Sequence, residues 1–516
     1  MTSPIAIKGL NKPPKFLGAF AVFSLILILI PLIYLVIRSS ENGFGGIINV
    51  LSRPRIYSII FTTLSLSILV GIFALLLGVF TSWTISRTNV VFRKFWLLLL
   101  PIPLAMPSYV LTYSWITLIP TLQGFWFAVI VLSCASFPFV AIPVYASLKT
   151  IDSSQEEVAR TLGFNTWGIF LKVLWPQIRP AALSGSLLAG LYTLSEFGTV
   201  AILEVDTLTR LIFTTYRATY DRSSAATISI ILLLVSLFVV NISRKFAGTS
   251  YRSKIGPGTS RQSTFSNIGK LRYLAFSLFV VLNGFIIGIP GYVLITRSLS
   301  VRQELNFNQL LNASLNTIQV SFIGATLALL LAVPLGILGS RFKTKLAFKI
   351  ESTILITHAV PSIVIALSLV ALSVKWLPFI YQTIFLLAIA YALLFMANSI
   401  GIVKANISKV STQLEDVSRS LGKNYLSTLF RVTIPVALPG ILSGWLLVFV
   451  TAMKELPATL ILKPTNFETL STQLWTATSI SQYAQAAPYA LLLVVIASIP
   501  SYLLNRNNDS VRMEDR

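Results

Sequence analysis

The chain has 516 residues, of which 55% are hydrophobic and only 11% are charged, and its mean hydropathy is +0.80. Soluble domains carry about 25% charged residues, so this composition excludes an ordinary soluble protein. The formal net charge of +23 lies in short connectors between apolar runs and not in a soluble domain, which argues against a nucleic-acid-binding surface.

About twelve apolar runs reach the length of roughly 20 residues that a helix needs to cross a bilayer core. We therefore expect an all-α membrane protein that crosses the bilayer many times. The first run has no small-residue cleavage pattern, so it is expected to stay as a span and not to be removed as a signal peptide. The lone Cys134 lies within a run and excludes an intramolecular disulfide. The runs are 16–37, 57–85, 95–118, 124–147, 181–203, 224–243, 272–296, 315–338, 351–374, 380–402, 440–462 and 486–504.

Basic residues gather in alternate connectors between the runs. This is the positive-inside pattern, and it predicts that these connectors and both chain termini lie in the cytoplasm. The residues that carry the pattern outside the central linker are Lys8, Lys12, Lys15, Arg87, Arg93, Lys94, Arg341, Lys343, Lys345 and Lys349.

Residues 244–272 are basic and rich in serine and glycine, as is typical of a flexible cytoplasmic linker. They separate a first half, 1–243, from a second half, 273–516. The two halves match in register, which predicts an internal duplication with six spans in each copy. An even number of spans makes both copies face the same way, so we expect them to be related by an axis along the membrane normal. Matching pairs include Thr63/Thr317, Arg87/Arg341, Glu156/Glu415, Arg160/Arg419, Gly163/Gly422, Asn165/Asn424, Pro176/Pro435 and Glu196/Glu455.

The polar segments at about 150–180 and 404–439 each predict a short helix that starts with a capping box. Ser153 and Glu156 have the spacing of such a box, and Thr412 and Glu415 repeat it. Acidic residues also occupy the first turn, where the helix dipole favours them. Both segments therefore carry the signature of a helix N-terminus.

Each short helix is followed by a glycine suited to a left-handed C-cap, an asparagine suited to cap a second helix, and a proline expected to end that helix. We interpret each segment as a helix–turn–helix elbow on the cytoplasmic face, offered twice to a soluble partner that is itself a dimer. The alternative is a solvated loop with helical propensity. The residues are Gly163, Asn165 and Pro176 in the first copy and Gly422, Asn424 and Pro435 in the second.

The order of residues in these elbows resembles the "EAA" coupling loop of ATP-binding-cassette (ABC) importer permeases. The first copy reads Glu157…Gly163…Val173…Pro176, and the second reads Asp416…Gly422…Val432…Pro435. In that family the loop enters a cleft on the ATPase subunit and passes nucleotide-driven closure to the membrane helices. The resemblance covers nearly the whole chain and implies two tandem six-helix permease units of type I. The coupling residues that it implies are Glu156, Glu157, Ala159, Gly163, Pro176, Glu415, Asp416, Ser418, Gly422 and Pro435.

The fused two-half form also resembles permeases for ferric iron. The stretches "MKELPATLILKPTNFETLSTQLW" (453–475) and "LSEFGTVAIL" (194–203) carry this resemblance. It implies an importer of ferric iron in the cytoplasmic membrane of a bacterium, and related fused permeases for thiamine and phosphonates leave those substrates as alternatives. A secondary transporter with twelve spans is a further alternative, although it has no use for two matched docking elbows.

The same resemblance implies the partners of the chain. They are two cytoplasmic ABC ATPase subunits, an extracytoplasmic substrate-binding protein and membrane lipid, with no cofactor bound by the chain itself and ATP used by the partners. In agreement, Gly269-Lys270 and Gly422-Lys423 lack the upstream glycine of a Walker A loop. We therefore expect a transporter subunit that is not itself an enzyme, and a membrane enzyme would need a cluster of chemical side chains that the sequence does not show.

Two acidic residues, Glu196 and Glu455, fall about fifteen residues inside predicted spans. Charged groups in a bilayer normally face a bundle interior or water. Two interpretations stay open: the pair lines the translocation path or its gate, or it forms an internal hydrogen-bonded brace.

The repeated prolines Pro107 and Pro361 kink their spans, either at a gate or in ordinary packing. The single histidine, His358, has no partners for a metal site and is expected to serve packing or a hinge. The metal-binding residues, if any, are left open.

Overall fold

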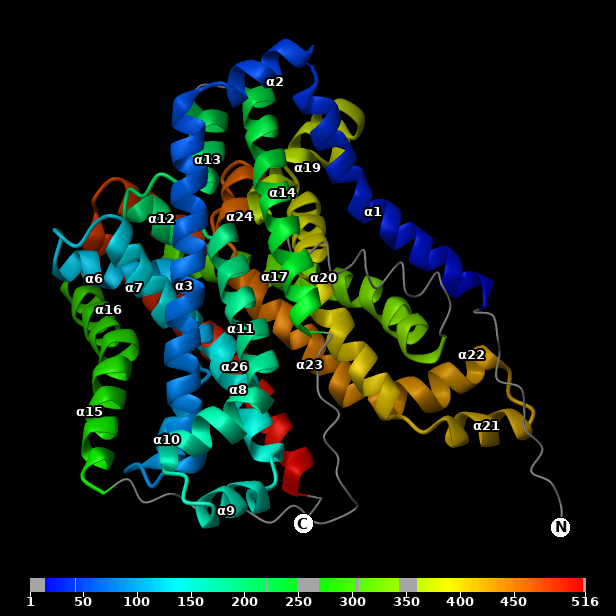
Figure 1. The fold of residues 1–516 in the computed structure, drawn as a ribbon. Coiled ribbons are helices and arrows are strands. Elements are labelled where there is room, and N and C mark those ends of the chain that lie inside the picture. Colours follow the sequence, from blue (N-terminus) through cyan, green and yellow to red (C-terminus); the bar gives the residue numbers. More distant parts are fainter. Residues whose placement is uncertain are drawn as a thin grey trace. The chain divides into compact units, whose positions relative to one another are not determined.

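The computed structural model describes residues 14–41, 43–218, 221–247, 269–301, 306–342 and 360–513. These residues form helices and connecting turns with no strand among them (Figure 1), which confirms the predicted all-α class. The first half of the chain contains α1 (Lys15–Ser39), α2 (Gly43–Leu51), α3 (Pro54–Arg87), α4 (Arg93–Leu99), α5 (Ile102–Ala105), α6 (Ser108–Leu118), α7 (Phe125–Ser136), α8 (Pro138–Thr150), α9 (Ser153–Thr161), α10 (Thr166–Ile169), α11 (Trp175–Ser195), α12 (Gly198–Ile202), α13 (Leu208–Ala218) and α14 (Arg222–Ala247).

The second half follows the same plan. It contains α15 (Leu271–Asn283), α16 (Ile289–Ser300), α17 (Phe307–Arg341), α19 (Ser362–Trp376), α20 (Ile384–Lys409), α21 (Thr412–Ser420), α22 (Tyr425–Thr428), α23 (Ile434–Met453), α24 (Pro457–Leu462), α25 (Leu470–Ser479) and α26 (Tyr483–Met513). Three π-helical segments (Phe170–Leu174, Gly284–Gly288 and Leu429–Thr433) join helices into longer rods, and a short 3-10 helix covers Pro378–Ile380.

Among the described residues, nine helices are long and apolar enough to cross a membrane, or ten if one bent pair counts as a single span. The bent pair is Arg93–Ala105 with Ser108–Leu118, and its two parts meet at 94°. The break falls at Pro107. Proline lacks a backbone N–H and disfavours helical backbone conformation in the residue before it, so a break is expected there. Part of the predicted run 351–374, including His358, and most of the predicted linker 244–272 lie outside the described residues.

The helices form two compact units. One contains the described residues of Met1–Arg38, Leu311–Thr472 and Val495–Arg516, and the other those of Ser39–Leu310 and Gln473–Val494. The first helix of each repeat is therefore exchanged: α1 clusters with the body of the second half, and α15 and α16 cluster with the body of the first. The two units are defined by contacts between residues, whereas the predicted halves are defined by the sequence repeat. The predicted boundaries of the halves, 1–243 and 273–516, therefore stay a prediction.

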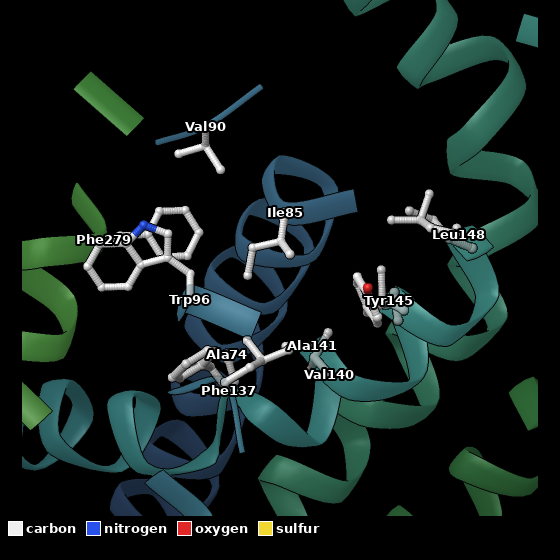
Figure 2. Packing of buried hydrophobic residues seen from close by; sticks show 14 of the residues in the cluster. Ala74, Ile85, Val90, Trp96, Phe137, Val140, Ala141, Tyr145, Leu148 and Phe279 are labelled. Carbon is white, nitrogen blue, oxygen red and sulfur yellow. The ribbon is translucent and has the colours of Figure 1, made fainter. Parts of the chain in front are cut away.

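In the Ser39–Leu310 unit, α3 packs closely against α8 and α11. The α3–α8 approach depends on glycine, because a Cβ at Gly78 of α3 would lie 2.5 Å from the Val140 Cβ atom of α8. The same holds where α11 packs on α8, because a Cβ at Gly185 would lie 2.5 Å from the carbonyl oxygen of Phe139. Such small residues let helix backbones approach in a bilayer. Figure 2 shows buried side chains where α3 approaches α8, with Ile85 of α3 and Val140 of α8 among those labelled.

In the unit that contains α17, the corresponding helices are α17, α20 and α23. A Cβ at Gly336 of α17 would lie 2.6 Å from the Val403 Cγ1 atom of α20, and one at Gly440 of α23 would lie 2.0 Å from the Asn406 Cγ atom. The Trp445 indole of α23 also donates a hydrogen bond to the Thr326 hydroxyl of α17 at 3.2 Å. Each unit therefore has one long helix packed against the two helices that flank its elbow. Elbow 1 consists of α9 and α10 between α8 and α11, and elbow 2 consists of α21 and α22 between α20 and α23.

Candidate functional site: two elbows tied to the long helices

The first helix of each elbow is capped one residue earlier than the sequence predicted. The Asp152 carboxylate accepts a hydrogen bond from the backbone N–H of Ser154 at 3.0 Å, and the Ser411 hydroxyl accepts one from Gln413 at 3.2 Å. The predicted capping boxes from Ser153 to Glu156 and from Thr412 to Glu415 are therefore wrong. The glutamates do not turn back to the helix start because each pairs with an arginine from a distant helix.

The turn after this helix has the predicted left-handed glycine in both copies. Gly163 has φ of +81° and Gly422 has φ of +79°. The N–H of Phe164 donates to the carbonyl of Ala159 at 3.1 Å, and that of Lys423 donates to the carbonyl of Ser418 at 3.2 Å. These are the long bonds of Schellman motifs, in which glycine avoids the steric cost of positive φ.

The second helix starts as predicted and ends elsewhere. Asn165 Oδ1 accepts from the N–H of Gly168, and Asn424 Oδ1 accepts from that of Ser427, both at 2.8 Å. The prediction that the elbow prolines end the helix is wrong, because the chain passes through a π-helical turn and continues as α11 or α23. The wider turn stands directly before Pro176 or Pro435 and accommodates the ring and the missing N–H, so the elbow runs without interruption into the next long helix.

A buried ion pair attaches elbow 1 to α3. Arg87 Nε, at the last residue of α3, lies 2.9 Å from Glu156 Oε1, and the side chains are only 4% and 7% exposed. The same guanidinium donates to the carbonyl oxygen of Leu148 in α8 at 2.6 Å. Arg87 therefore joins α3, α8 and α9 at a single point.

Elbow 2 has the same attachment to α17. Arg341 Nη2 lies 2.8 Å from Glu415 Oε1 and donates to the carbonyl oxygen of Val410 at 2.9 Å. The sequence held a signal for this pair, since Arg87 and Arg341 match in register. The match was attributed to the internal duplication and the positive-inside pattern, and not to an ion pair.

The burial of these pairs makes each partner depend on the other. Burial raises the pKa of Glu156, and the positive charge of Arg87 counteracts that rise. Removing one member of a buried pair leaves an uncompensated charge at a cost of several kcal/mol, even where the intact pair adds little net stability. We conclude that each pair fixes the position of its elbow on the end of a long helix.

The predicted coupling residues divide between the two faces of each elbow. Glu156, Ala159, Glu415 and Ser418 are buried and form the inner face. Glu157, Gly163, Pro176, Gly422 and Pro435 are exposed, and Asp416 is half-buried.

Four exposed apolar side chains of the elbows match between the two copies, and their exposure was not foreseen from the sequence. Val158 and Val417 are 58% and 59% exposed, and Leu162 and Leu421 are 71% and 76% exposed. Matched apolar residues at this exposure on a polar helix are typical of an interaction surface. Beside elbow 1 lies an open groove lined by Ser154, Gln155, Val158, Lys172, Val173, Pro176 and Gln177.

The acidic residues Glu196 and Glu455 lie at helix breaks and not inside continuous spans. α11 ends at Ser195 and α23 ends at Met453, so the predicted spans 181–203 and 440–462 are wrong in their extent. Glu196 Oε1 accepts from the N–H of Thr199 at 3.1 Å, and Glu455 Oε1 accepts from that of Ala458 at 3.0 Å. Each carboxylate therefore caps the short helix, α12 or α24, that follows the break.

Pro107 and Pro361 stand directly before α6 and α19, with extended backbone at φ of −61° and −60°. Among the described residues, no group of three or more His, Cys, Asp or Glu side chains is arranged to hold a metal ion. Roles in a pathway or gate for the two prolines and the two glutamates stay predictions.

We expect Arg87→Met to lower the free energy of unfolding by about 3–5 kcal/mol, because it leaves the Glu156 carboxylate buried without its partner. Thermal unfolding of the purified chain in detergent measures this loss. Adding Glu156→Met should restore most of the midpoint. Arg55→Met is the matched control, because its ion pair with Asp206 is exposed and exposed pairs contribute little. Equal midpoints for Arg87→Met and Arg55→Met would contradict the structural role of the buried pair.

Comparisons with known proteins agree with this geometry. The model of a family described as "Binding-protein-dependent transport system inner membrane component" matches residues 74–249 and 324–510, so the family unit occurs twice. The Fe(3+)-transport system permease protein FbpB 2 of Haemophilus influenzae is 34% identical over 501 residues, which cover 96% of this chain and 99% of that protein.

More distant relatives match only part of the chain. The sulfate transport system permease protein CysT of Escherichia coli is 25% identical over 43% of this chain and 88% of its own length. Its CysW counterpart is 25% identical over 36% of this chain and 69% of its own length. The chain therefore belongs to the family of binding-protein-dependent transport system inner membrane components, as an ABC permease in which two family units are fused.

Proposed function

We propose that this chain is the permease of an ATP-driven importer and that ferric iron is its substrate. The observation that carries the iron assignment is the 34% identity with a ferric iron permease across 96% of the chain, both units included. The sulfate permeases match 43% and 36% of the chain, which is the extent expected for a shared family unit. Thiamine and phosphonates remain as alternative substrates of the same architecture.

Two cytoplasmic ATPase subunits would dock on the two elbows, one on each. The matched exposure of Val158 with Val417 and of Leu162 with Leu421 supports a partner that presents the same apolar cleft twice. ATP would be bound and hydrolysed by these subunits, and an extracytoplasmic binding protein would deliver the substrate, in keeping with the family description.

The elbows and the basic connectors would lie in the cytoplasm, together with both chain termini, according to the positive-inside rule. Closure of the ATPase subunits would then pull on α9 and α21. The pull would reach α3 through Arg87 and Glu156, and α17 through Arg341 and Glu415. Because α3 and α17 are the longest helices of their units, their tilt would switch the pathway between inward-facing and outward-facing states.

The helix breaks at Glu196 and Glu455 would lie near the pathway. A broken helix leaves backbone groups that need partners, and such breaks are tolerated where they are buried in protein or line a cavity. We propose that the carboxylates act first as caps that hold α12 and α24 in place, and that Pro107 and Pro361 permit gate movement at the neighbouring breaks.

Gly163→Pro combined with Gly422→Pro should abolish co-purification of the ATPase while the chain still inserts into the membrane. Proline is fixed near φ of −65° and cannot adopt the observed +81° and +79°. Gly163→Asn with Gly422→Asn is the matched control, because asparagine tolerates left-handed backbone. A proline variant that retains the ATPase would remove the docking role of the elbows.

Deletion of this chain should abolish uptake of labelled ferric iron at limiting concentration in cells whose other iron systems have been removed. The wild-type chain should restore uptake, and the double proline variant should not. If uptake is unchanged by deletion, the iron assignment is wrong, and thiamine and phosphonate uptake are the next measurements.

The double variant Glu196→Gln, Glu455→Gln should keep most of the transport rate, because an amide oxygen accepts the same backbone hydrogen bonds. Glu196→Leu with Glu455→Leu removes both caps and should lower the rate strongly. Both variants are measured as initial uptake at matched expression. Loss of transport in the glutamine variant would show that the negative charge itself is required, as in a cation pathway.

A further inference from the structure

The interiors of the two elbows differ, although their outlines match in register. In elbow 2, Glu415 Oε1 receives the Arg341 guanidinium at 2.8 Å and a hydrogen bond from the Thr433 hydroxyl at 2.8 Å. A second buried hydrogen bond joins the Ser418 and Thr428 hydroxyls at 3.0 Å. The interior of elbow 2 is therefore a polar network that connects α21, α22 and the π-helical turn to α17.

In elbow 1, the three positions that correspond to Thr433, Ser418 and Thr428 are Leu174, Ala159 and Ile169. All three are buried, and none has a side-chain hydrogen-bond donor. The neighbouring contacts are aromatic: the ring of Phe170 lies 5.6 Å from Trp83 of α3 and 5.3 Å from Trp167. Elbow 1 thus combines one buried ion pair with apolar packing against α3. A part-buried hydrogen bond from Gln177 Nε2 to Gln155 Oε1 at 2.9 Å joins α9 to α11, but it makes no link to α3.

The two elbows also differ at the start of their second helix. Tyr425 of elbow 2 contacts the rings of Phe16 in α1 and Phe342, each at 6.4 Å, and the Arg419 guanidinium lies 5.6 Å from its centroid. The corresponding residue in elbow 1 is Thr166, which has no ring to make such contacts. Elbow 2 is therefore also braced from a second helix, α1.

These differences have a mechanical consequence. Hydrogen bonds to a charged group are directional and strong, and in a buried site any displacement leaves a polar group without its partner. Apolar packing is non-directional, so a helix can shift within it at lower cost. The network should therefore hold α21 more stiffly on α17 than the packing holds α9 on α3.

We propose that the two elbows differ in stiffness. α21 is held rigidly on α17 and passes partner movement to it directly, whereas α9 shifts on α3 before it passes the movement on. Ser418, Thr428 and Thr433 are the positioning residues that make the difference. This inference rests on the proposed function of the elbows as ATPase docking sites. On closure of the ATPase pair, α17 then follows its elbow directly and α3 follows after α9 has shifted.

Hydrogen–deuterium exchange of the full chain in lipid nanodiscs measures this stiffness without any partner. We expect the backbone amides of α21 to exchange about tenfold or more slowly than those of α9, because opening elbow 2 breaks hydrogen bonds to a buried charge. The triple variant Ser418→Ala, Thr428→Ile, Thr433→Leu should raise exchange in α21 to the level of α9. Equal exchange in the two wild-type helices, or slower exchange in α9, would overturn the proposal.

A functional measurement separates positioning from folding. In the reconstituted complex, Thr433→Val should lower the ferric iron moved per ATP hydrolysed several-fold, whereas Thr433→Ser, which keeps the hydroxyl, should restore the ratio. The matched control is Leu174→Val in elbow 1, which changes side-chain size at the corresponding position without removing a donor. An unchanged ratio for Thr433→Val would overturn the proposal.

The proposal and the docking function can fail separately. If the exchange difference is present but the double proline variant still binds the ATPase, the elbows are unequal and the docking assignment is wrong. If the ATPase is lost in that variant but the amides of α9 and α21 exchange at equal rates, the docking assignment stands and the proposed difference in stiffness is wrong.

Discussion

The organisation of this permease depends on one buried contact that occurs twice, the ion pair between an arginine at the end of a long helix and a glutamate in an elbow. Arg87 reaches Glu156, and Arg341 reaches Glu415. A charge buried alone is costly, so the position of each elbow is determined by the helix end that neutralises it. Without the pair, a nine-residue helix such as α9 would be attached to its unit by apolar packing, by the hydrogen bond from Gln177 to Gln155 and by the two chain ends that leave it.

The sequence predicted those features that depend on neighbouring residues. The left-handed turns at Gly163 and Gly422 and the caps at Asn165 and Asn424 follow from local backbone chemistry, and the structure confirms them. The capping boxes failed because Glu156 and Glu415 have partners far away in the chain, and no local pattern reveals such a partner. The elbow prolines were expected to end a helix, since the rule for an ideal α-helix does not foresee the π-helical turn before them.

The extent of the spans shows the same limit. An apolar run records that a segment lies in the bilayer, but it does not show whether the helix is continuous. The breaks at Glu196 and Glu455 depend on carboxylates that cap α12 and α24, and on a close approach at Gly198, where a Cβ would lie 2.7 Å from Tyr109. The exchange of α1 and α15 between repeats likewise arises from packing, which the repeat pattern alone cannot reveal.

The central claim is that the buried ion pair couples each elbow to its long helix, and a distance measurement across the ATP cycle tests it most directly. Spin labels at Ser154 and Leu76 report on elbow 1 and α3, and labels at Gln413 and Leu330 occupy the corresponding positions on elbow 2 and α17, in a chain whose only cysteine is replaced by Cys134→Ser. We expect the mean distance on elbow 2 to stay constant between nucleotide-free and ATP-bound complexes, and the mean distance on elbow 1 to change only by the small shift of α9. Both distances should change further when Arg87→Met or Arg341→Met is introduced. If the elbow 2 distance changes with nucleotide while its ion pair is intact, the elbow pivots independently and the pair does not couple it to the membrane helices.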